Sequence, residues 1–298
     1  MIRKLWYFGS WFVRCTLGRK KIPLTSSMII TDRCNLRCKH CTVSDPASPE
    51  RTFAELARDT TALYRTGARV LVVTGGEPFV WKDGGYSLED VVAYARRLGF
   101  FRIVVCTNGT FKLESSADYL WVSLDGDDSA HNAIRGDCHS RVIENIGASS
   151  HPGIYVNFTV SRMNLNAFDK AIEDILSIRN IRGMLVHLFT PYIGSDPCLR
   201  LDKRERASAI DTIIRLKRRH PLRITNTFDG LRALKDNRWP RPLWSSVVIN
   251  RGQVGMCCCR QGIYDRQVCE NCGCSPATET YVLEQAKPLA IIENLRFL

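Results

Sequence analysis

The sequence predicts an α/β fold: a partial β/α barrel of about six units with parallel strands. Short runs rich in Val, Ile, Leu and aromatic residues alternate with segments of helical periodicity between residues 26 and 189. Strand–helix units repeated in this way form right-handed crossovers and a parallel sheet. About six units fit, which is too few for a closed eight-unit barrel. We therefore expect the functional residues at the carboxyl ends of the strands, where such sheets carry their sites.

The individual elements follow from periodicity and from helix-start signals. Helices are predicted where apolar residues recur at helical spacing, and Ser87 with Asp90 three residues later is typical of a helix start. The predicted strands span residues 27–31, 70–74, 102–107, 119–124, 155–160 and 184–189. The predicted helices span residues 52–66, 87–98, 139–148, 166–179 and 202–219.

The chain divides into three predicted parts. Residues 1–25 form an aromatic and basic N-terminal helix, residues 26–220 the partial barrel, and residues 221–298 a cysteine-rich extension. Within the extension, residues 246–250 and 253–256 flank Arg251-Gly252, a pattern that predicts a β-hairpin. The length of 298 residues is compatible with one large and one small domain.

The charge distribution indicates an anionic partner. Lys and Arg number 42 against 30 Asp and Glu, a net charge of +12. The excess lies in residues 1–31 and 201–242. The apolar run of residues 5–13 is too short to span a bilayer and has basic flanks on both sides, which disfavours a signal peptide. Two interpretations stay open: this helix lies in an anionic membrane interface, or it packs on the protein itself.

Thirteen cysteines, many of them in two dense groups, indicate metal sites in a reducing compartment and hence a cytoplasmic protein. Directly after the first predicted strand, Cys34, Cys38 and Cys41 have C-x3-C-x2-C spacing. Three thiolates on one short loop can bind three irons of a cubane cluster and leave the fourth iron open for a small molecule. A zinc site with His40 as the fourth ligand is the alternative.

Polar sets follow three further strands. Thr74-Gly75-Gly76-Glu77-Pro78, Thr107-Asn108-Gly109 and Ser123-Leu124-Asp125-Gly126 each lie at the predicted carboxyl end of a strand. The two glycines would let a ligand approach the backbone closely. The Glu77 carboxylate can accept a hydrogen bond from an ammonium group.

Together these motifs resemble the radical S-adenosylmethionine (SAM) superfamily over roughly residues 26–194. The resemblance implies a [4Fe-4S] cluster on the three cysteines of the loop, with SAM bound at the open iron. It also implies SAM contacts, in strand order, from His40, Gly75, Gly76, Glu77, Pro78, Asn108, Ser123, Asp125 and Ser161. His131 and Arg135-Gly136 resemble a stretch of the subgroup that carries auxiliary clusters.

The C-terminal cysteines resemble part of a SPASM or twitch auxiliary-cluster domain. The candidate ligands of a second iron-sulfur cluster are Cys257, Cys259, Cys269, Cys272 and Cys274. The pattern departs from the usual one because no cysteine stands shortly before Gly252. A single iron or zinc ion and a reduced thiol tail are the alternatives.

The predicted function is a radical SAM oxidoreductase that cleaves SAM reductively and abstracts hydrogen from a substrate carbon through a 5′-deoxyadenosyl radical. No general acid or base is identified, because the cofactor does the chemistry. The basic segments favour a membrane lipid or isoprenoid substrate, and the auxiliary-cluster resemblance favours a peptide. The residues before the first strand leave no room for a leader-binding module, which tilts the prediction away from leader-dependent peptides. An electron donor such as ferredoxin or flavodoxin is expected. Nucleic-acid modification and a non-catalytic iron-sulfur or zinc protein are the alternatives of another class.

Overall fold

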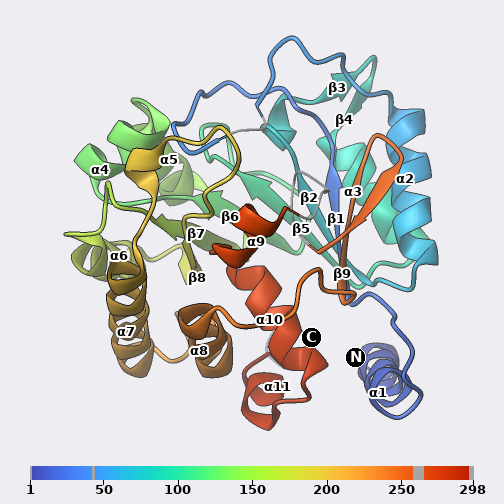
Figure 1. Ribbon diagram of the computed structural model, residues 1–298. Helices are drawn as coiled ribbons and strands as arrows, with labels where there is room; N and C mark the ends of the chain where they lie inside the picture. Colours follow the sequence, from blue (N-terminus) through green and yellow to red (C-terminus); the bar gives the residue numbers. More distant parts are fainter. Residues whose placement is uncertain (1, 42–43, 258–264, 295–298) are drawn as a thin grey trace.

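The described residues form one 8-stranded sheet wrapped by helices (Figure 1). The computed structural model describes residues 2–41, 44–257 and 265–294. The strand order is β10-β9-β1-β2-β5-β6-β7-β8, and all neighbours are parallel except β9 and β10. The predicted partial barrel is confirmed. The strands are β1 (Thr25–Ile29), β2 (Val70–Thr74), β5 (Arg102–Thr107), β6 (Tyr119–Ser123), β7 (Ile154–Val160), β8 (Ile181–Leu188), β9 (Ser246–Asn250) and β10 (Gln253–Met256).

Helices cover the convex face of this sheet. Alternate strand residues such as Leu71, Ile103 and Val122 are fully buried in one core with the apolar faces of these helices. Residues between them, such as Trp121 and Tyr155, point to the opposite, concave face. The covering helices are α2 (Phe53–Arg65), α3 (Leu88–Leu98), α5 (His139–Ala148), α6 (Phe168–Ser177), α7 (Lys203–Arg219) and α8 (Phe228–Asp236).

Local signals explain where two of these helices begin. Thr52 and Glu55 form a capping box before α2, and the Asp90 carboxylate accepts from the Ser87 backbone N–H at 2.8 Å before α3. The first strand begins at Thr25, two residues earlier than predicted. A helix that was not predicted, α4 (Asp128–Arg135), follows β6, and Asp127 caps it. A small hairpin, β3 (Lys82–Asp83) and β4 (Tyr86–Ser87), lies before α3.

The hairpin predicted within the C-terminal extension completes the main sheet. β9 pairs in parallel with β1, from Thr25 opposite Ser246 to Met28 opposite Ile249. After β10 come three helices: α9 (Arg266–Glu270), α10 (Ser275–Glu284) and α11 (Pro288–Asn294). Figure 1 shows α9 and α10 in front of the concave face.

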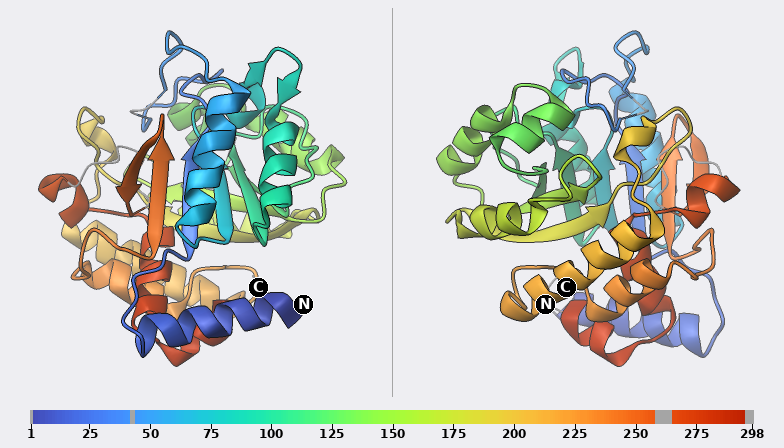
Figure 2. Two further views of the ribbon diagram at one scale, coloured as in Figure 1. Left: turned by 90° about the vertical axis from the view of Figure 1, so that its right-hand side faces the viewer. Right: turned by 60° about the vertical axis from the view of Figure 1, so that its left-hand side comes forward.

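The N-terminal helix α1 (Ile2–Thr16) lies at the end of the sheet where the strands begin, as Figure 2 shows. The Tyr7 hydroxyl donates to the carbonyl of Gly67, and the Tyr7 ring packs edge-on against Phe101 at 5.3 Å. Both partners precede strands, so α1 is remote from the strand ends that carry the site. None of the described helices has the length and hydrophobicity needed to cross a lipid bilayer.

Candidate active site

The cysteine loop leaves the end of β1 and runs along the turn that follows β2. The N–H groups of Gly76 and Glu77 donate to the carbonyls of Thr31 at 2.7 Å and Arg33 at 2.9 Å. A Cβ atom on Gly76 would lie 2.0 Å from the Arg33 oxygen, which no side chain tolerates. The cysteine loop therefore approaches these glycines closely, and the glycines fix the backbone next to Cys34.

Asn108 connects the cysteine loop to the end of β5. Its side-chain N–H groups donate to Asn35 Oδ1 at 2.9 Å and to Cys34 Sγ at 3.7 Å, and its oxygen accepts from the Thr110 N–H at 3.0 Å. The Leu36 N–H also points at Cys34 Sγ at 3.4 Å. Donors directed at sulfur favour the thiolate, which is the form that binds iron.

Cys38 lies against α4. The Lys39 N–H donates to the Ile134 carbonyl at 2.9 Å, and Cys38 Sγ lies 3.9 Å from the Arg135 carbonyl. Burial raises the pKa of the Cys38 thiol to about 11, against the opposing effect of Arg135 and with a contribution from the neighbouring thiols of Cys41 and Cys34. The three thiols therefore lie within electrostatic reach of one another, as ligands on one cubane require.

Glu77 is completely buried and holds two strand ends together. Its carboxylate accepts from the Thr107 hydroxyl at 2.8 Å and from the N–H groups of Asn108 at 2.7 Å and Phe79 at 3.1 Å. Burial raises the pKa of Glu77 to about 7. Pro78, also buried, follows in a short 3-10 turn. The carboxylate therefore has internal donors in addition to any ammonium group it binds.

Asp125 forms a buried ion pair that the sequence analysis did not predict. Its Oδ2 accepts from Arg135 Nε at 2.6 Å, and its Oδ1 accepts from the Thr159 N–H at 2.8 Å. Although burial opposes it, the Arg135 guanidinium holds the pKa of Asp125 below its ordinary value. His131 Nδ1 accepts from the Asp125 N–H at 3.2 Å, so α4 is tied to this strand end twice.

The remaining predicted SAM residues lie at the same rim. Ser123 ends β6 and stands opposite Asn157 of β7. Ser161 follows β7 and is buried, and its N–H donates to Asn164 Oδ1 at 2.8 Å. His40, on the cysteine loop, is half-buried and within electrostatic reach of Asp125. The rim thus unites the polar sets that follow β1, β2, β5, β6 and β7.

Four of the five candidate ligands in the C-terminal tail, which we define as residues 257–298, lie together. The fifth, Cys259, lies outside the described residues. Cys257, Cys272 and Cys274 pack against Trp239 and Leu243. Burial, with a smaller contribution from the thiols of Cys274 and Cys257, raises the pKa of Cys272 to about 12. The Cys269 thiol also interacts with Cys257. Within the described residues no three Cys, His, Asp or Glu side chains converge as they would on a single metal ion.

The tail bridges the two edges of the open sheet. Cys257 directly follows β10 at one edge. At the other edge, the Leu188 N–H of β8 donates to the Gly273 carbonyl at 3.0 Å, and a Cβ on Gly273 would lie 1.9 Å from the Leu188 oxygen. From α7, Arg206 reaches the Cys272 carbonyl at 2.7 Å and the Leu234 carbonyl at 2.8 Å. The cysteine-rich tail is therefore held across the concave side.

The concave face near the site is lined by neutral groups. Trp121 stands next to Tyr155 and Cys106 in the strand register, and Asn157 Oδ1 lies 3.2 Å from His187 Nε2. Burial lowers the pKa of His187 to about 4, so its imidazole is uncharged at neutral pH. The Trp121 Nε1 atom is buried without a hydrogen-bond partner. This face can therefore accept an apolar group that carries a hydrogen-bond acceptor.

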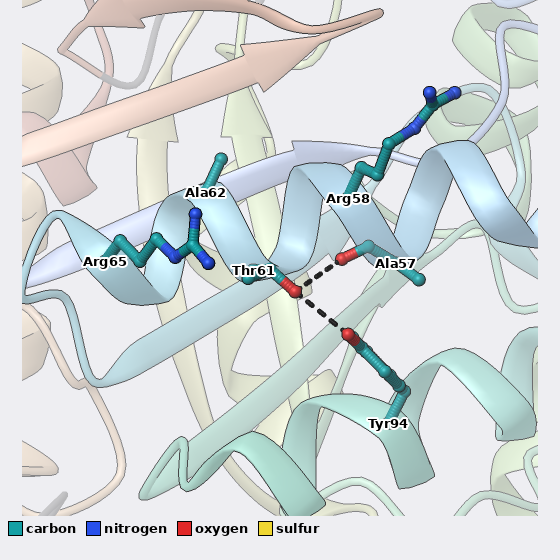
Figure 3. A pocket seen from close by; sticks show the side chains of 6 residues that line it. All are labelled: Ala57, Arg58, Thr61, Ala62, Arg65 and Tyr94. Carbon is teal, nitrogen blue, oxygen red and sulfur yellow. Dashed lines mark hydrogen bonds between the residues drawn. The ribbon is translucent and has the colours of Figure 1, made fainter.

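A separate hollow of about 340 Å³ lies on the outer surface between α2 and α3 (Figure 3). Thr61 Oγ1 and the Tyr94 hydroxyl lie 2.9 Å apart there. Both helices cover the convex face, and none of the predicted site residues lines the hollow. Its lining residues are Ala57, Arg58, Thr61, Ala62, Arg65 and Tyr94.

Several residues that organise the site gave no recognisable signal in the sequence. Asn164 donates to the carbonyls of Asp125 at 2.7 Å and Thr159 at 2.9 Å. Arg251, in the turn of the β9–β10 hairpin, donates to Asp32 at 3.1 Å and Ser48 at 2.6 Å near the cysteine loop. Both connect segments far apart in the sequence, so only the fold reveals them.

Comparison with known proteins agrees with this geometry. The Radical SAM superfamily model matches residues 28–177. Fe-coproporphyrin III synthase of Methanosarcina barkeri is 31% identical over 241 residues, which are 70% of this chain and 58% of that protein. Pre-heme d1 synthase of Dinoroseobacter shibae is 32% identical over 52% of this chain and 40% of its own length. The chain thus spans about half the length of the curated relatives it matches.

Two solved structures share the fold. Streptococcus suis SuiB bound to S-adenosylmethionine has a TM-score of 0.64 at 13% identity, with 91% of this chain and 67% of that one covered. The enzyme anSMEcpe with bound AdoMet and a Cp18Cys peptide has a TM-score of 0.58 at 14% identity, with 91% and 82% covered. The family model covers half of the sequence, including the cysteine loop and the strand ends. The chain therefore belongs to the radical SAM superfamily, whose members use a [4Fe-4S] cluster and SAM.

Proposed function

We propose that this protein is a radical SAM oxidoreductase that takes a hydrogen atom from a carbon of a largely apolar substrate, a membrane lipid or an isoprenoid. When bound, the cluster supplies the electron that splits SAM into methionine and the 5′-deoxyadenosyl radical. A hydrogen atom of the substrate carbon would pass to that radical, which would give 5′-deoxyadenosine and a substrate radical. The observation behind the substrate class is the neutral concave face with Trp121, Tyr155 and the uncharged His187.

The residues of this chain would serve as a rigid frame for that reaction. Cys34, Cys38 and Cys41 would hold the cluster. Glu77 and Asp125 fasten the strand ends, so that SAM and substrate meet at a fixed distance. The tail across the concave side would exclude water and stray hydrogen donors. We further propose that Cys257, Cys269, Cys272 and Cys274 hold a second iron-sulfur cluster, supported by their common location.

The N-terminal helix does not argue for a lipid substrate, because α1 lies at the end opposite the site. The proposal rests on the concave face instead. Several relatives are named as synthases of heme-type compounds, whose large macrocycle is apolar.

A peptide maturase is the second candidate function. The likeness to SuiB, whose structure with the precursor peptide SuiA is known, covers 93% of this chain and therefore extends beyond the predicted barrel of residues 26–220. A relative from Bacillus subtilis named for subtilosin biosynthesis is 27% identical over half of the chain.

We also propose that ferredoxin or flavodoxin is the electron donor. We propose further that this protein is cytoplasmic and associates peripherally with an anionic membrane. Support for the membrane comes from the six basic residues that precede Asp32 in a segment without any acidic residue.

The test is anaerobic reconstitution with iron and sulfide, followed by incubation with SAM and a strong reductant. The wild type should form 5′-deoxyadenosine, and the variant with Cys34, Cys38 and Cys41 all replaced by Ala should form none. Adding a lipid extract, but not a peptide pool, should increase the yield of 5′-deoxyadenosine. A lipid in that extract should change its mass in proportion to the 5′-deoxyadenosine formed. Stimulation by peptides alone would favour the maturase. Product from the triple variant would overturn the cluster assignment.

The second cluster has its own readout. Wild-type protein should bind clearly more than about four irons, and the variant lacking Cys269, Cys272 and Cys274 should return to about four. Equal iron content in the two proteins would leave the tail as free thiols or a site for another metal.

A further inference from the structure

We propose that the end of the molecule opposite the active site docks on an anionic lipid surface through the outer faces of α1 and α11. This inference rests on the peripheral membrane association proposed above and adds the surface and its orientation. We call this surface the basal face. Its exposed apolar residues are Trp6 and Val13 of α1, Leu17 directly after α1, and Leu289 and Ile292 of α11.

The inner side of α1 is fixed to the body, which sets the direction of its outer side. Trp11 is buried, and its ring lies tilted against that of Trp244 with the ring centroids 6.2 Å apart. Its Nε1–H donates to the Ile22 carbonyl at 2.8 Å. Together with the Tyr7 contacts to Gly67 and Phe101, these interactions prevent the helix from rolling.

Three exposed apolar side chains lie along α1 and the turn that follows it. Trp6, Val13 and Leu17 are 73%, 52% and 80% exposed. Trp6 and Val13 are seven positions apart and therefore lie on one face of the helix. The Leu17 N–H donates to the Val13 carbonyl at 2.9 Å, so Leu17 continues this face in the turn after α1. A helix that served only as packing for the barrel would place its large apolar residues inward.

The C-terminal helix extends this surface. Leu289 and Ile292 of α11 are 45% and 65% exposed. All views in Figures 1 and 2 place α1 and α11 at the same end of the molecule. Glu284, at the end of α10, lies within electrostatic reach of both Cys15 and Lys21, which places the start of α11 close to the end of α1.

The charges around these apolar residues identify the partner as an anionic lipid surface. Arg14, Arg19, Lys20 and Lys21 are exposed, and Lys287 precedes α11. The nearby carboxylates have internal partners: Glu284 accepts from the Ser245 N–H at 3.1 Å, and Glu293 pairs with the buried Lys217 at 2.8 Å. Two copies of such a face would repel each other, whereas anionic headgroups would neutralise the basic residues.

Docking in this way turns the active site away from the bilayer. The cysteine loop and the strand ends lie at the far end of the sheet from α1 (Figure 2). The electron donor would thus reach the site from the aqueous side, and a lipid or isoprenoid substrate would have to leave the bilayer to enter it. Variants of the basal face should leave SAM cleavage unchanged while altering lipid binding.

The experiment is co-sedimentation of the reconstituted full-length protein with phosphatidylcholine vesicles and with vesicles that also contain phosphatidylglycerol. We expect binding only to the anionic vesicles, lost at high salt. The double variant Trp6→Ser/Leu17→Ser and the double variant Leu289→Ser/Ile292→Ser should each bind roughly tenfold or more weakly. Ile193→Ser is the matched control, because Ile193 is 66% exposed but lies in the loop after β8. Brominated lipid should quench fluorescence in the wild type more than in Trp6→Phe.

The outcomes separate the two levels of the proposal. A wild type that stays in solution with every vesicle overturns peripheral membrane association and the basal face together. Anionic binding that both double variants retain overturns the basal face alone. Dimerisation without lipid that the Trp6→Ser/Leu17→Ser variant abolishes would make the face a protein interface and overturn the lipid assignment. Each result is independent of 5′-deoxyadenosine formation, which tests the enzymatic proposal.

Discussion

Replacing Glu77 by Gln removes a negative charge from the strand-end site and preserves the size of the side chain. If the carboxylate binds the ammonium group of SAM, the variant loses a charge-assisted hydrogen bond of roughly 1.5–3 kcal/mol. That free energy corresponds to about a 10- to 150-fold weaker affinity for SAM. Gln can still accept from the Asn108 N–H and donate to the Thr107 hydroxyl, so most of the internal contacts survive.

Glu77→Ala adds a structural effect that can be measured separately. The Ala variant leaves the N–H groups of Phe79 and Asn108 and the hydroxyl of Thr107 without their acceptor in a buried place. Each buried donor left without an acceptor costs about 1–3 kcal/mol. The free energy of unfolding should therefore fall several times more in the Ala variant than in the Gln variant.

The assay is isothermal titration of reconstituted protein with SAM, together with iron analysis and urea unfolding of the same preparations. The charge hypothesis requires the Gln variant to keep its iron and lose SAM affinity. A Gln variant that binds SAM as tightly as the wild type would show that Glu77 only fastens the strand ends.

Three further substitutions test the frame of the site. Gly76→Ala should lower the iron content after reconstitution, because its Cβ would lie 2.0 Å from the Arg33 oxygen. Gly85→Ala is the control, because nothing lies within 4 Å of the added atom. Equal iron content in the two variants would refute the packing argument. Arg206→Ala should speed hydrogen exchange at the tail by about tenfold or more, since four hydrogen bonds to the backbone carbonyls of Leu234, Asn271 and Cys272 are lost. The same change at an exposed neighbour in α7 should not have this effect. Glu279→Gln should stabilise the protein at pH 8 by up to about 3 kcal/mol and have little effect at pH 5. Burial raises the pKa of Glu279 from 4.5 to about 7, so the wild type loses stability as the pH rises through this range. Thermal unfolding that shows an equal effect of the substitution at both pH values would contradict this prediction.

The sequence predicted those parts of the fold that local periodicity encodes. The strand over 102–107 and the hairpin 246–256 were placed correctly, because each combines an apolar run with a clear turn or helix boundary. The helix α4 was missed because it has only 8 residues and begins with charged residues that are equally typical of a loop. The pairing of β9 with β1 joins residues more than 200 positions apart, and no local signal reports such a partner.

For the site, sequence reasoning identified positions more easily than interactions. The polar sets after β2, β5 and β6 meet at one rim, as parallel strands require. The partners of those residues were not predictable: Arg135 reaches Asp125 only because α4 folds back over the strand end. For Gly76, the structure adds a second reason for glycine, because the backbone near Cys34 approaches it closely. The predicted approach of a ligand stays a prediction.

Glu77 and Asp125 each connect two neighbouring strand ends of the sheet. Each carboxylate directly follows a strand, is fully buried and accepts an N–H from a segment beyond it: Asn108 after β5 for Glu77, and Thr159 of β7 for Asp125. Each therefore locks two strand ends of the sheet together. Because hydrogen transfer needs the reacting atoms at a fixed, short distance, a rim locked in this way limits the positions that SAM and substrate can take. A substitution at either carboxylate would then affect the reaction even if that carboxylate never touches SAM, which is why the Gln and Ala variants of Glu77 have to be compared rather than measured singly.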